Sequence, residues 1–142
     1  MRRTLKTGFN QQHLDLWLLL LRVLVTVFMF THGFPKFYKL MAGGEVQFRD
    51  VLGMGPAVSL SLAVFAEVIC STFVLVGLGT RLATIPLIIT MLTAAFVAHA
   101  DDPFGKKELP LLYLFIYITV LILGSGKYSI DFLLSVKPNS KK

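Results

Sequence analysis

Charged residues and cysteine are both scarce in this sequence. Only 15% of its 142 residues are Asp, Glu, Lys or Arg, while 55% are hydrophobic and the mean hydropathy is +0.72. Soluble globular domains carry about 25% charged residues, so this composition excludes that class. The one cysteine, Cys70, excludes an intramolecular disulfide, and the lack of a CxxC motif argues against thiol–disulfide chemistry.

Three further absences narrow the choice. The net charge of +6 is spread over loops and tails without an aromatic-interleaved basic patch, which argues against nucleic-acid binding and fits membrane anchoring. Arg2-Arg3 is similar to the start of a twin-arginine signal, but no small-x-small cleavage site follows the first apolar run, so we expect that run to be retained. Internal repeats and low-complexity segments are missing, and we expect a single domain over residues 1–142.

Four long apolar runs dominate the chain. We expect spans at about 14–34, 57–79, 82–100 and 109–126, each near the roughly 20 residues that a helix needs to cross a hydrocarbon core. Lipid offers the backbone no hydrogen-bond partners, so the spans must be helical. The predicted fold is an all-α integral membrane protein, a bundle of four transmembrane helices surrounded by the lipid bilayer.

The loops predict the orientation of this bundle. Eight basic residues fall on the side that holds both termini and five on the other side, so the positive-inside rule places both termini in the cytoplasm, with the bundle in a bacterial inner membrane. In the first outer loop, Phe48, Val51 and Leu52 have helical spacing. They indicate a short amphipathic helix over about 45–53, with an ordinary covered loop as an equal alternative.

Two charges lie inside the apolar runs, Arg22 in the first and Glu67 in the second. A charge at bilayer depth costs about 3 kcal/mol on insertion scales, so it is seldom left unpaired. At 1.5 Å per residue, Arg22 lies roughly 12 Å and Glu67 roughly 18 Å from the cytoplasmic side, and an extended arginine can close most of that gap. We therefore expect the two to pair. The pair is either a bridge that fixes helix register or part of a pocket that holds a ligand or relays a proton through Glu67.

The helix faces around these charges support an inward orientation. Small residues permit close helix approach in lipid, so both charged faces should point into the bundle. The face of Arg22 also holds Thr26, Met29 and Gly33, and the face of Glu67 also holds Ser59, Ala63, Cys70 and Ser71.

A second polar group is expected at the outer end of the bundle. His32 and Lys36 follow the first span, His99 ends the third and Glu108 opens the fourth, so all four should lie at one membrane depth. Two histidines on different helices could ligate haem iron, but half-hydrated interfacial histidines are much commoner, and we assign no metal site. Tyr113, on the fourth span, either lines the same pocket or belongs to an aromatic belt.

The C-terminal sequence predicts structural roles. Gly124 should end the fourth span, and Ser129 or Asp131 can cap a short helix over residues 132–136. Arg81 and Asp131 should both face the cytoplasm. A bridge between them would tie the last helix to the central hairpin.

In their order and spacing these residues resemble the DoxX family of small four-helix bacterial membrane proteins. The resemblance extends from Leu16 to Leu133 and includes the motifs Thr31-His32-Gly33-Phe34-Pro35-Lys36 and Gly124-Ser125-Gly126-Lys127-Tyr128-Ser129-Ile130-Asp131. The positions that match the family pattern are Arg22, Gly33, Lys36, Glu67, Arg81, Glu108, Ser129 and Asp131. The resemblance implies a four-span bundle in the cytoplasmic membrane. Some relatives, the DoxD-type proteins, are subunits of thiosulfate:quinone oxidoreductases, which implies quinone as a candidate ligand.

Two hypotheses from different classes follow. In the first, the protein is a membrane subunit of a redox complex that binds quinone or quinol, with no catalytic residue assigned. The candidate ligand-binding residues are then Arg22, His32, Lys36, Glu67, His99, Glu108 and Tyr113. In the second, it is a non-catalytic scaffold, assembly factor or small-solute conduit, and the buried charges hold the bundle together. Other subunits of a complex, or a second copy of the chain, are the protein partners that these hypotheses allow. The residues given structural roles are Gly33, Arg81, Gly124, Ser129 and Asp131.

Overall fold

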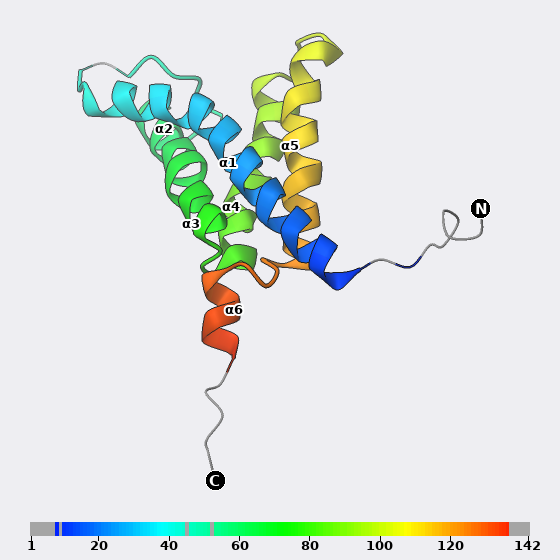
Figure 1. Ribbon diagram of the computed structural model, residues 1–142. Helices are drawn as coiled ribbons and strands as arrows, with labels where there is room; N and C mark the ends of the chain where they lie inside the picture. Colours follow the sequence, from blue (N-terminus) through cyan, green and yellow to red (C-terminus); the bar gives the residue numbers. More distant parts are fainter. Residues whose placement is uncertain (1–7, 9, 45, 52, 137–142) are drawn as a thin grey trace.

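The computed structural model describes residues 8, 10–44, 46–51 and 53–136, and every regular element within them is helical (Figure 1). The elements are α1 (Gln11–Met41), α2 (Pro56–Val64), the π-helical turn η1 (Phe65–Cys70), α3 (Ser71–Val76), α4 (Thr80–Thr93), the π-helical turn η2 (Ala94–Ala98), α5 (Phe104–Leu123) and α6 (Ile130–Ser135). α2, η1 and α3 follow one another without a break, as do α4 and η2. The all-α prediction is confirmed for these residues.

The bundle has two distinct ends (Figure 1). The start of α1, the turn between α3 and α4, the end of α5 and the short helix α6 lie together, and we call this the α6 end. The segment between α1 and α2 and the connection between η2 and α5 lie at the other end, which we call the loop end. The chain therefore runs toward the loop end in α1 and in α4, and back toward the α6 end in the α2–α3 rod and in α5.

α1 is longer than the sequence predicted. It begins after Asn10, whose side chain accepts a hydrogen bond from the N–H of Gln12 at 2.9 Å. The expected end was near residue 34, but the helix continues through Pro35 to Met41. A proline removes one backbone hydrogen bond and bends a helix without having to end it. The ribbon of α1 bends before its final turns (Figure 1), and the extension places Lys36 on the helix.

The second and third spans form the predicted antiparallel hairpin, with a turn that begins slightly earlier than expected. α3 ends where Gly77, at φ 72°, donates its N–H to the carbonyl of Phe73 at 2.9 Å. α4 begins after Gly79, at φ 56°. Both glycines have left-handed backbone conformations that other residues rarely adopt, so the turn closes within three residues.

α5 begins at Phe104, more than one turn before the expected start at 109, and it ends at Leu123. Gly124 follows at φ 81° and its N–H donates to the carbonyl of Val120 at 2.8 Å, so the predicted end of this helix is confirmed to within a turn. α5 packs chiefly against α4. This places the third and fourth expected spans side by side.

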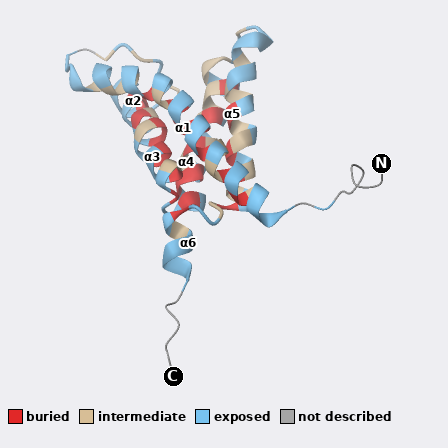
Figure 2. Cartoon of the chain, viewed as in Figure 1, coloured by how far each residue is buried: buried red, intermediate tan, exposed pale blue. Residues whose placement is uncertain are grey.

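Among the described residues, many large apolar side chains are exposed, whereas several polar side chains lie with the apolar core among the buried residues, which Figure 2 marks in red. Leu82 and Phe115 are each 73% exposed, whereas Arg22, Thr26 and Glu67 are buried. Polar groups that face inward while large apolar side chains face outward are expected of a bundle surrounded by lipid.

Within the described part of the chain, three helical rods are long and apolar enough to cross a membrane: Gln11–Met41, Pro56–Val76 and Thr80–Ala98. The fourth expected span coincides with α5, whose first turns carry Lys106, Lys107 and Glu108. The structure therefore supports a membrane protein with three candidate spans. A fourth span, if the protein has one, is α5.

The amphipathic helix expected over 45–53 is absent from the described part of that segment, residues 46–51 and 53, so the prediction is wrong there. Polar contacts hold the segment instead. Arg49 donates to the carbonyl of Ala98. Asp50 accepts from the N–H groups of Met54 and Gly55 at 3.2 and 2.9 Å, just before α2 begins. These bonds attach an extended segment to the ends of two helices, which removes the need for a helix of its own.

Candidate functional site

Arg22 is fully buried but does not pair with Glu67. Its Nη1 donates to the carbonyl oxygen of Val74 at 3.3 Å and its Nη2 donates to that of Tyr128. A methyl group at Gly77 would lie 2.2 Å from Arg22 Nη1, so the guanidinium occupies space that this glycine leaves open. The predicted bridge is wrong, and Arg22 binds backbone carbonyls at the α6 end.

The direction of helical side chains explains this outcome. The Cα–Cβ bonds of a helix tilt toward its N-terminus. α1 starts at the α6 end, so Arg22 reaches toward that end. The α2–α3 rod runs the opposite way, so Glu67 reaches toward the loop end. The two side chains diverge, and each finds its partner elsewhere.

Glu67 pairs with Lys36 instead. Lys36 Nζ donates to Glu67 Oε1, and the side chain of the lysine is 30% exposed while that of the glutamate is 3% exposed. Oε2 of Glu67 has no hydrogen-bond partner among the described residues. Glu67 is thus a buried carboxylate that is neutralised through one oxygen and retains an unused acceptor on the other.

Gly33 places α1 directly against η1. A methyl group at this position would lie 2.9 Å from Val68 Cγ2 and 3.1 Å from Glu67 Cβ. The approach is close because glycine has no side chain, and it sets the distance between the helix that carries Lys36 and the turn that carries Glu67. Glu67 lies in a π-helical turn, a rare conformation that often occurs at functional sites.

A cavity of about 180 Å³ lies beside this ion pair. Five of the seven predicted ligand-binding residues line it: His32, Lys36, Glu67, His99 and Tyr113. The apolar part of the wall is formed by Met29 of α1, Met91 of α4 and Leu109 of α5. The other two candidates are not brought to it, since Arg22 lies toward the α6 end and the exposed Glu108 forms no part of the wall.

Three contacts involve side chains that line the cavity. The rings of His32 and Tyr113 meet edge to face with their centroids 6.0 Å apart. His99 Nδ1 lies 2.7 Å from Asp102 Oδ2, and Lys106 Nζ lies 3.5 Å from Asp102 Oδ1. The hydrogen bond with His99 holds the pKa of Asp102 below its usual value despite a small opposing effect of burial, and the charge of Lys106 acts in the same direction as the hydrogen bond.

Asp102 and Lys106 were not among the predicted site residues. Their spacing carried a signal, because His99, Asp102 and Lys106 follow one another at i, i+3 and then i, i+4, as contacting residues in helical turns do. The sequence placed His99 at the outer end but did not identify the carboxylate that binds its ring.

Buried hydroxyl groups continue from the cavity toward the α6 end. The hydroxyls of Ser71 and Tyr117 approach each other without reaching hydrogen-bond geometry. Thr26 donates to the carbonyl of Ser71 at 3.2 Å. The rings of Tyr113 and Tyr117 are stacked with centroids 6.3 Å apart. The interior between the ion pair and Arg22 is therefore lined with polar groups as well as with the apolar core.

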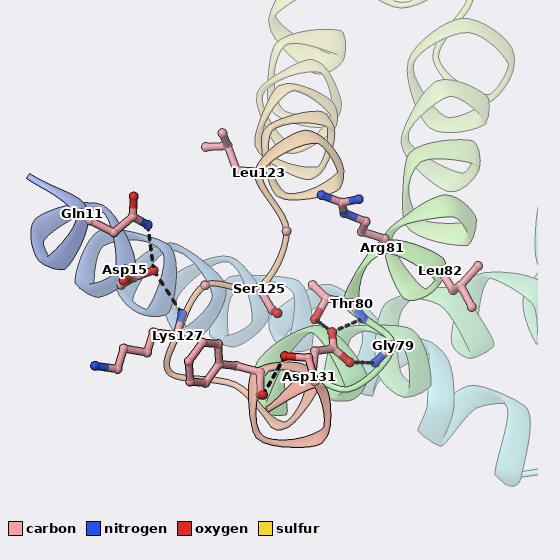
Figure 3. Close-up of a pocket in the computed structure, with 14 residues that line it drawn as sticks. Gln11, Asp15, Gly79, Thr80, Arg81, Leu82, Leu123, Ser125, Lys127 and Asp131 are labelled. Carbon is pink, nitrogen blue, oxygen red and sulfur yellow. Dashed lines mark hydrogen bonds between the residues drawn. The ribbon is translucent and has the colours of Figure 1, made fainter. Parts of the chain in front are cut away.

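A larger cavity of about 720 Å³ lies at the α6 end (Figure 3). Its carboxylates are already engaged within the chain. Asp131 accepts from the N–H of Gly79 at 2.7 Å and from both the N–H and the hydroxyl of Thr80 at 3.0 and 2.8 Å. Asp15 accepts from the N–H of Lys127 at 3.1 Å. We interpret this region as a structural joint between helices.

The predicted Arg81–Asp131 bridge is not formed. Arg81 donates to the carbonyl of Ile122 at 3.3 Å, because the oxygens of Asp131 are occupied by N–H and O–H groups at the start of α4. The predicted cap of the last helix is confirmed: Ser129 Oγ accepts at 3.1 Å from the N–H of Phe132, the third residue of α6.

Fold and cavity together define the class, a helical membrane protein with a buried lysine–glutamate pair beside an internal cavity. The DoxX family profile matches residues 17–100. A Bacillus subtilis (strain 168) protein named "Putative oxidoreductase CatD" is 30% identical over 114 residues, which is 80% of this chain and 83% of that protein. No solved structure matches the chain. The chain belongs to the DoxX family of membrane proteins.

Proposed function

We propose that this chain is a membrane subunit of an oxidoreductase system and binds the ring of a quinone or quinol in the cavity beside Glu67. One observation carries the proposal. A carboxylate that is 3% exposed lines a partly open cavity, with one oxygen paired to Lys36 and the other without a hydrogen-bond partner among the residues that the structure describes. A buried acceptor left unsatisfied is destabilising by roughly 1–3 kcal/mol, so it favours a ligand that supplies a hydrogen bond.

The size of the cavity suits one substituted ring. Its volume of about 180 Å³ exceeds the roughly 150 Å³ of an engineered protein cavity that accommodates benzene. Two methionine side chains supply polarizable walls for an aromatic ring. A long isoprenoid tail would have to leave the cavity for the lipid around the bundle, where the exposed side chains are apolar.

The polar groups at the cavity suit the oxygens of such a ring. Lys36 and His32 of α1 and His99, which directly follows η2, converge on one small volume. A few convergent polar groups in a mainly apolar pocket are typical of ligand sites. The name of the B. subtilis relative, an oxidoreductase, agrees with a redox-active ligand.

The test places a larger side chain in the cavity wall and compares it with the same substitution on the outer surface. Ala94, in η2, lines the cavity, whereas Val97 in the same turn is 43% exposed on the outer surface. In lipid nanodiscs, a soluble hydroquinone should raise the melting temperature of the wild type and of the Val97→Phe control. Ala94→Phe should abolish that shift, because the added ring takes the place of the ligand. A failure of hydroquinones and quinones alike to stabilise the wild type would contradict the proposal and favour the scaffold hypothesis.

A further inference from the structure

The hydrogen-bonding character of the cavity distinguishes two oxidation states of its ligand. An ionised carboxylate only accepts hydrogen bonds. Glu67 forms an ion pair with the ammonium group of Lys36 through Oε1, and its buried Oε2 has no hydrogen-bond partner within the part of the chain that the structure describes. A ligand in this cavity is therefore favoured if it donates a hydrogen bond to Glu67 Oε2.

His99 supplies a second acceptor. Its Nδ1 lies 2.7 Å from a carboxylate oxygen of Asp102. An ionised Asp102 can only accept, so Nδ1 must carry the proton. In a neutral imidazole the other nitrogen, Nε2, is then an acceptor, and His99 lines the same cavity as Glu67. Asp102 thus acts as a positioning residue that fixes the tautomer of His99.

The hydrogen-bond donors around the cavity depend less on a ligand than Glu67 Oε2 does. Lys36 already donates to Glu67, and its side chain is 30% exposed, so water can take its remaining N–H groups. Lys106 is exposed and lies against Asp102, and His32 is exposed on α1. The hydroxyl of Tyr113 can donate or accept. Leaving these groups without a ligand partner is less costly than leaving Glu67 Oε2 without one.

We propose that the cavity selects the reduced, hydroxyl-bearing form of its aromatic ligand, a quinol, over the carbonyl-bearing quinone, because the buried Glu67 Oε2 requires a donor and the Nε2 of a neutral His99 offers a second acceptor. The inference rests on the proposed function. It goes beyond it by assigning the preferred redox form and by giving His99 and Asp102 defined roles. A quinone oxygen accepts hydrogen bonds only, so it leaves the buried Glu67 Oε2 unsatisfied.

The test uses pairs of isomers that differ in donors and have no difference in composition. 2,3-Dimethylhydroquinone carries two hydroxyls, whereas its isomer 1,4-dimethoxybenzene carries none. Methylhydroquinone carries two, whereas its isomer 4-methoxyphenol carries one. Binding to the full chain in nanodiscs is measured by calorimetry under anaerobic conditions, with empty nanodiscs as the control for partition into lipid. We expect the affinity to fall roughly tenfold for each hydroxyl that is masked.

The outcomes separate this inference from the proposed function. Equal binding of 2,3-dimethylhydroquinone and 1,4-dimethoxybenzene, blocked in both cases by Ala94→Phe, would overturn the preference for donors and leave ring binding intact. Binding of neither isomer would overturn both proposals.

Two variants assign the acceptors. Asp102 lies outside the apolar rods, and Asp102→Asn removes the carboxylate that holds the proton on Nδ1 of His99. This variant should therefore reduce the preference for 2,3-dimethylhydroquinone several-fold. The affinity for 1,4-dimethoxybenzene, which donates no hydrogen bond, should not change. An unchanged preference would overturn the role of His99. Glu67→Leu should reduce the preference further. Should that variant not fold, the isomer series on the wild type still decides whether donors are required.

Discussion

Arg22 shows how a buried cation can be accommodated without a carboxylate beside it. Backbone carbonyls at the end of α3 and before α6 accept from both terminal nitrogens of its guanidinium. The charge of Asp131 also acts favourably on it through space. The planar guanidinium has five N–H donors. Through two of its nitrogens it connects α1 to α3 and to the segment before α6.

The two ion-pair hypotheses can be separated by double-mutant cycles. We expect Lys36→Met and Glu67→Gln to be coupled by more than about 1 kcal/mol, because each single change leaves a buried or half-buried partner without its hydrogen bond. Arg22→Met and Glu67→Gln should be additive to within about 0.5 kcal/mol, since they share no contact. The measurement is the free energy of reversible unfolding in mixed micelles.

Strong coupling between Arg22 and Glu67, with none between Lys36 and Glu67, would contradict this assignment. The Arg22–Glu67 cycle is the matched control for the other, because both cycles contain the same change at Glu67.

At single residues, the sequence identified burial better than partnership. Hydropathy showed that Arg22 and Glu67 lie inside helices, and both are buried. Their depths were estimated from helical rise alone, which ignores the opposite tilt of side chains on antiparallel helices. Arg22 also binds carbonyl groups, which every residue possesses, so no residue type in the sequence marks its partners.

At the scale of elements, the start of α4 depends on a residue from the other end of the chain. Gly79 precedes α4 and has no side chain with which to cap it. Asp131 provides the cap from α6, with both carboxylate oxygens on N–H or O–H groups of Gly79 and Thr80. The N–H of Asp131 in turn donates to the carbonyl of Gly77 at 2.8 Å. α6 is thereby fixed to the hairpin turn on both sides.

This cap predicts an acid-sensitive contribution to stability. Burial raises the pKa of Asp131, but hydrogen bonds from Thr80 and Gly79 outweigh it and hold the pKa below the ordinary value of 3.8. The folded-state pKa is thus the lower one, so the stabilisation is complete above the unfolded pKa and is lost as the pH falls through the folded pKa. Asp131→Ala should cost about 1 kcal/mol at neutral pH.

Asp131→Asn separates the charge from the cap, since an amide oxygen still accepts one hydrogen bond. We expect Asn to cost less than Ala, and the difference in melting temperature between the wild type and Asn to close on acidification below about pH 4. A difference that persists in acid would show that the carboxylate charge has no part in the effect.

The sequence predicted the helices well and their ends less well. The four apolar runs coincide with four long helical regions, three of which are apolar and long enough to cross a membrane among the described residues, and Gly124 and Ser129 lie at helix ends. Pro35 lies within α1, because a proline bends a helix that packing holds in place on both sides. The helix expected at 45–53 failed because helical spacing over so few residues competes poorly with capping bonds such as those of Asp50.

At the scale of the whole molecule, the two ends have different characters. The α6 end is held together by hydrogen bonds among α1, the hairpin turn, α6 and the segment before it, around the larger cavity. The cavity beside Glu67 lies toward the loop end, and the two π-helical turns contribute Glu67 and Ala94 to its wall. We expect the proposed ligand of this smaller cavity to enter at the loop end.

Orientation in the membrane can be argued further from the basic residues of the loop end. All five are engaged within the chain: Lys36 with Glu67, Lys39 with the carbonyl of Gln47, Arg49 with that of Ala98, Lys106 with Asp102 and Lys107 with the carbonyl of Ala100. Their presence at the loop end is therefore accounted for by these local hydrogen bonds. The basic residues expected on the side of the termini then dominate the positive-inside rule, which predicts that the α6 end faces the cytoplasm.

Cysteine labelling tests this orientation. The native Cys70 is buried, so the wild type should not react with a membrane-impermeant maleimide. Asp101→Cys, at the exposed loop end, should be labelled in intact spheroplasts. Lys127→Cys, at the α6 end, should be labelled only after the membrane is permeabilised. The reverse pattern would place the cavity on the cytoplasmic side, and a ligand that enters at the loop end would then come from the cytoplasm.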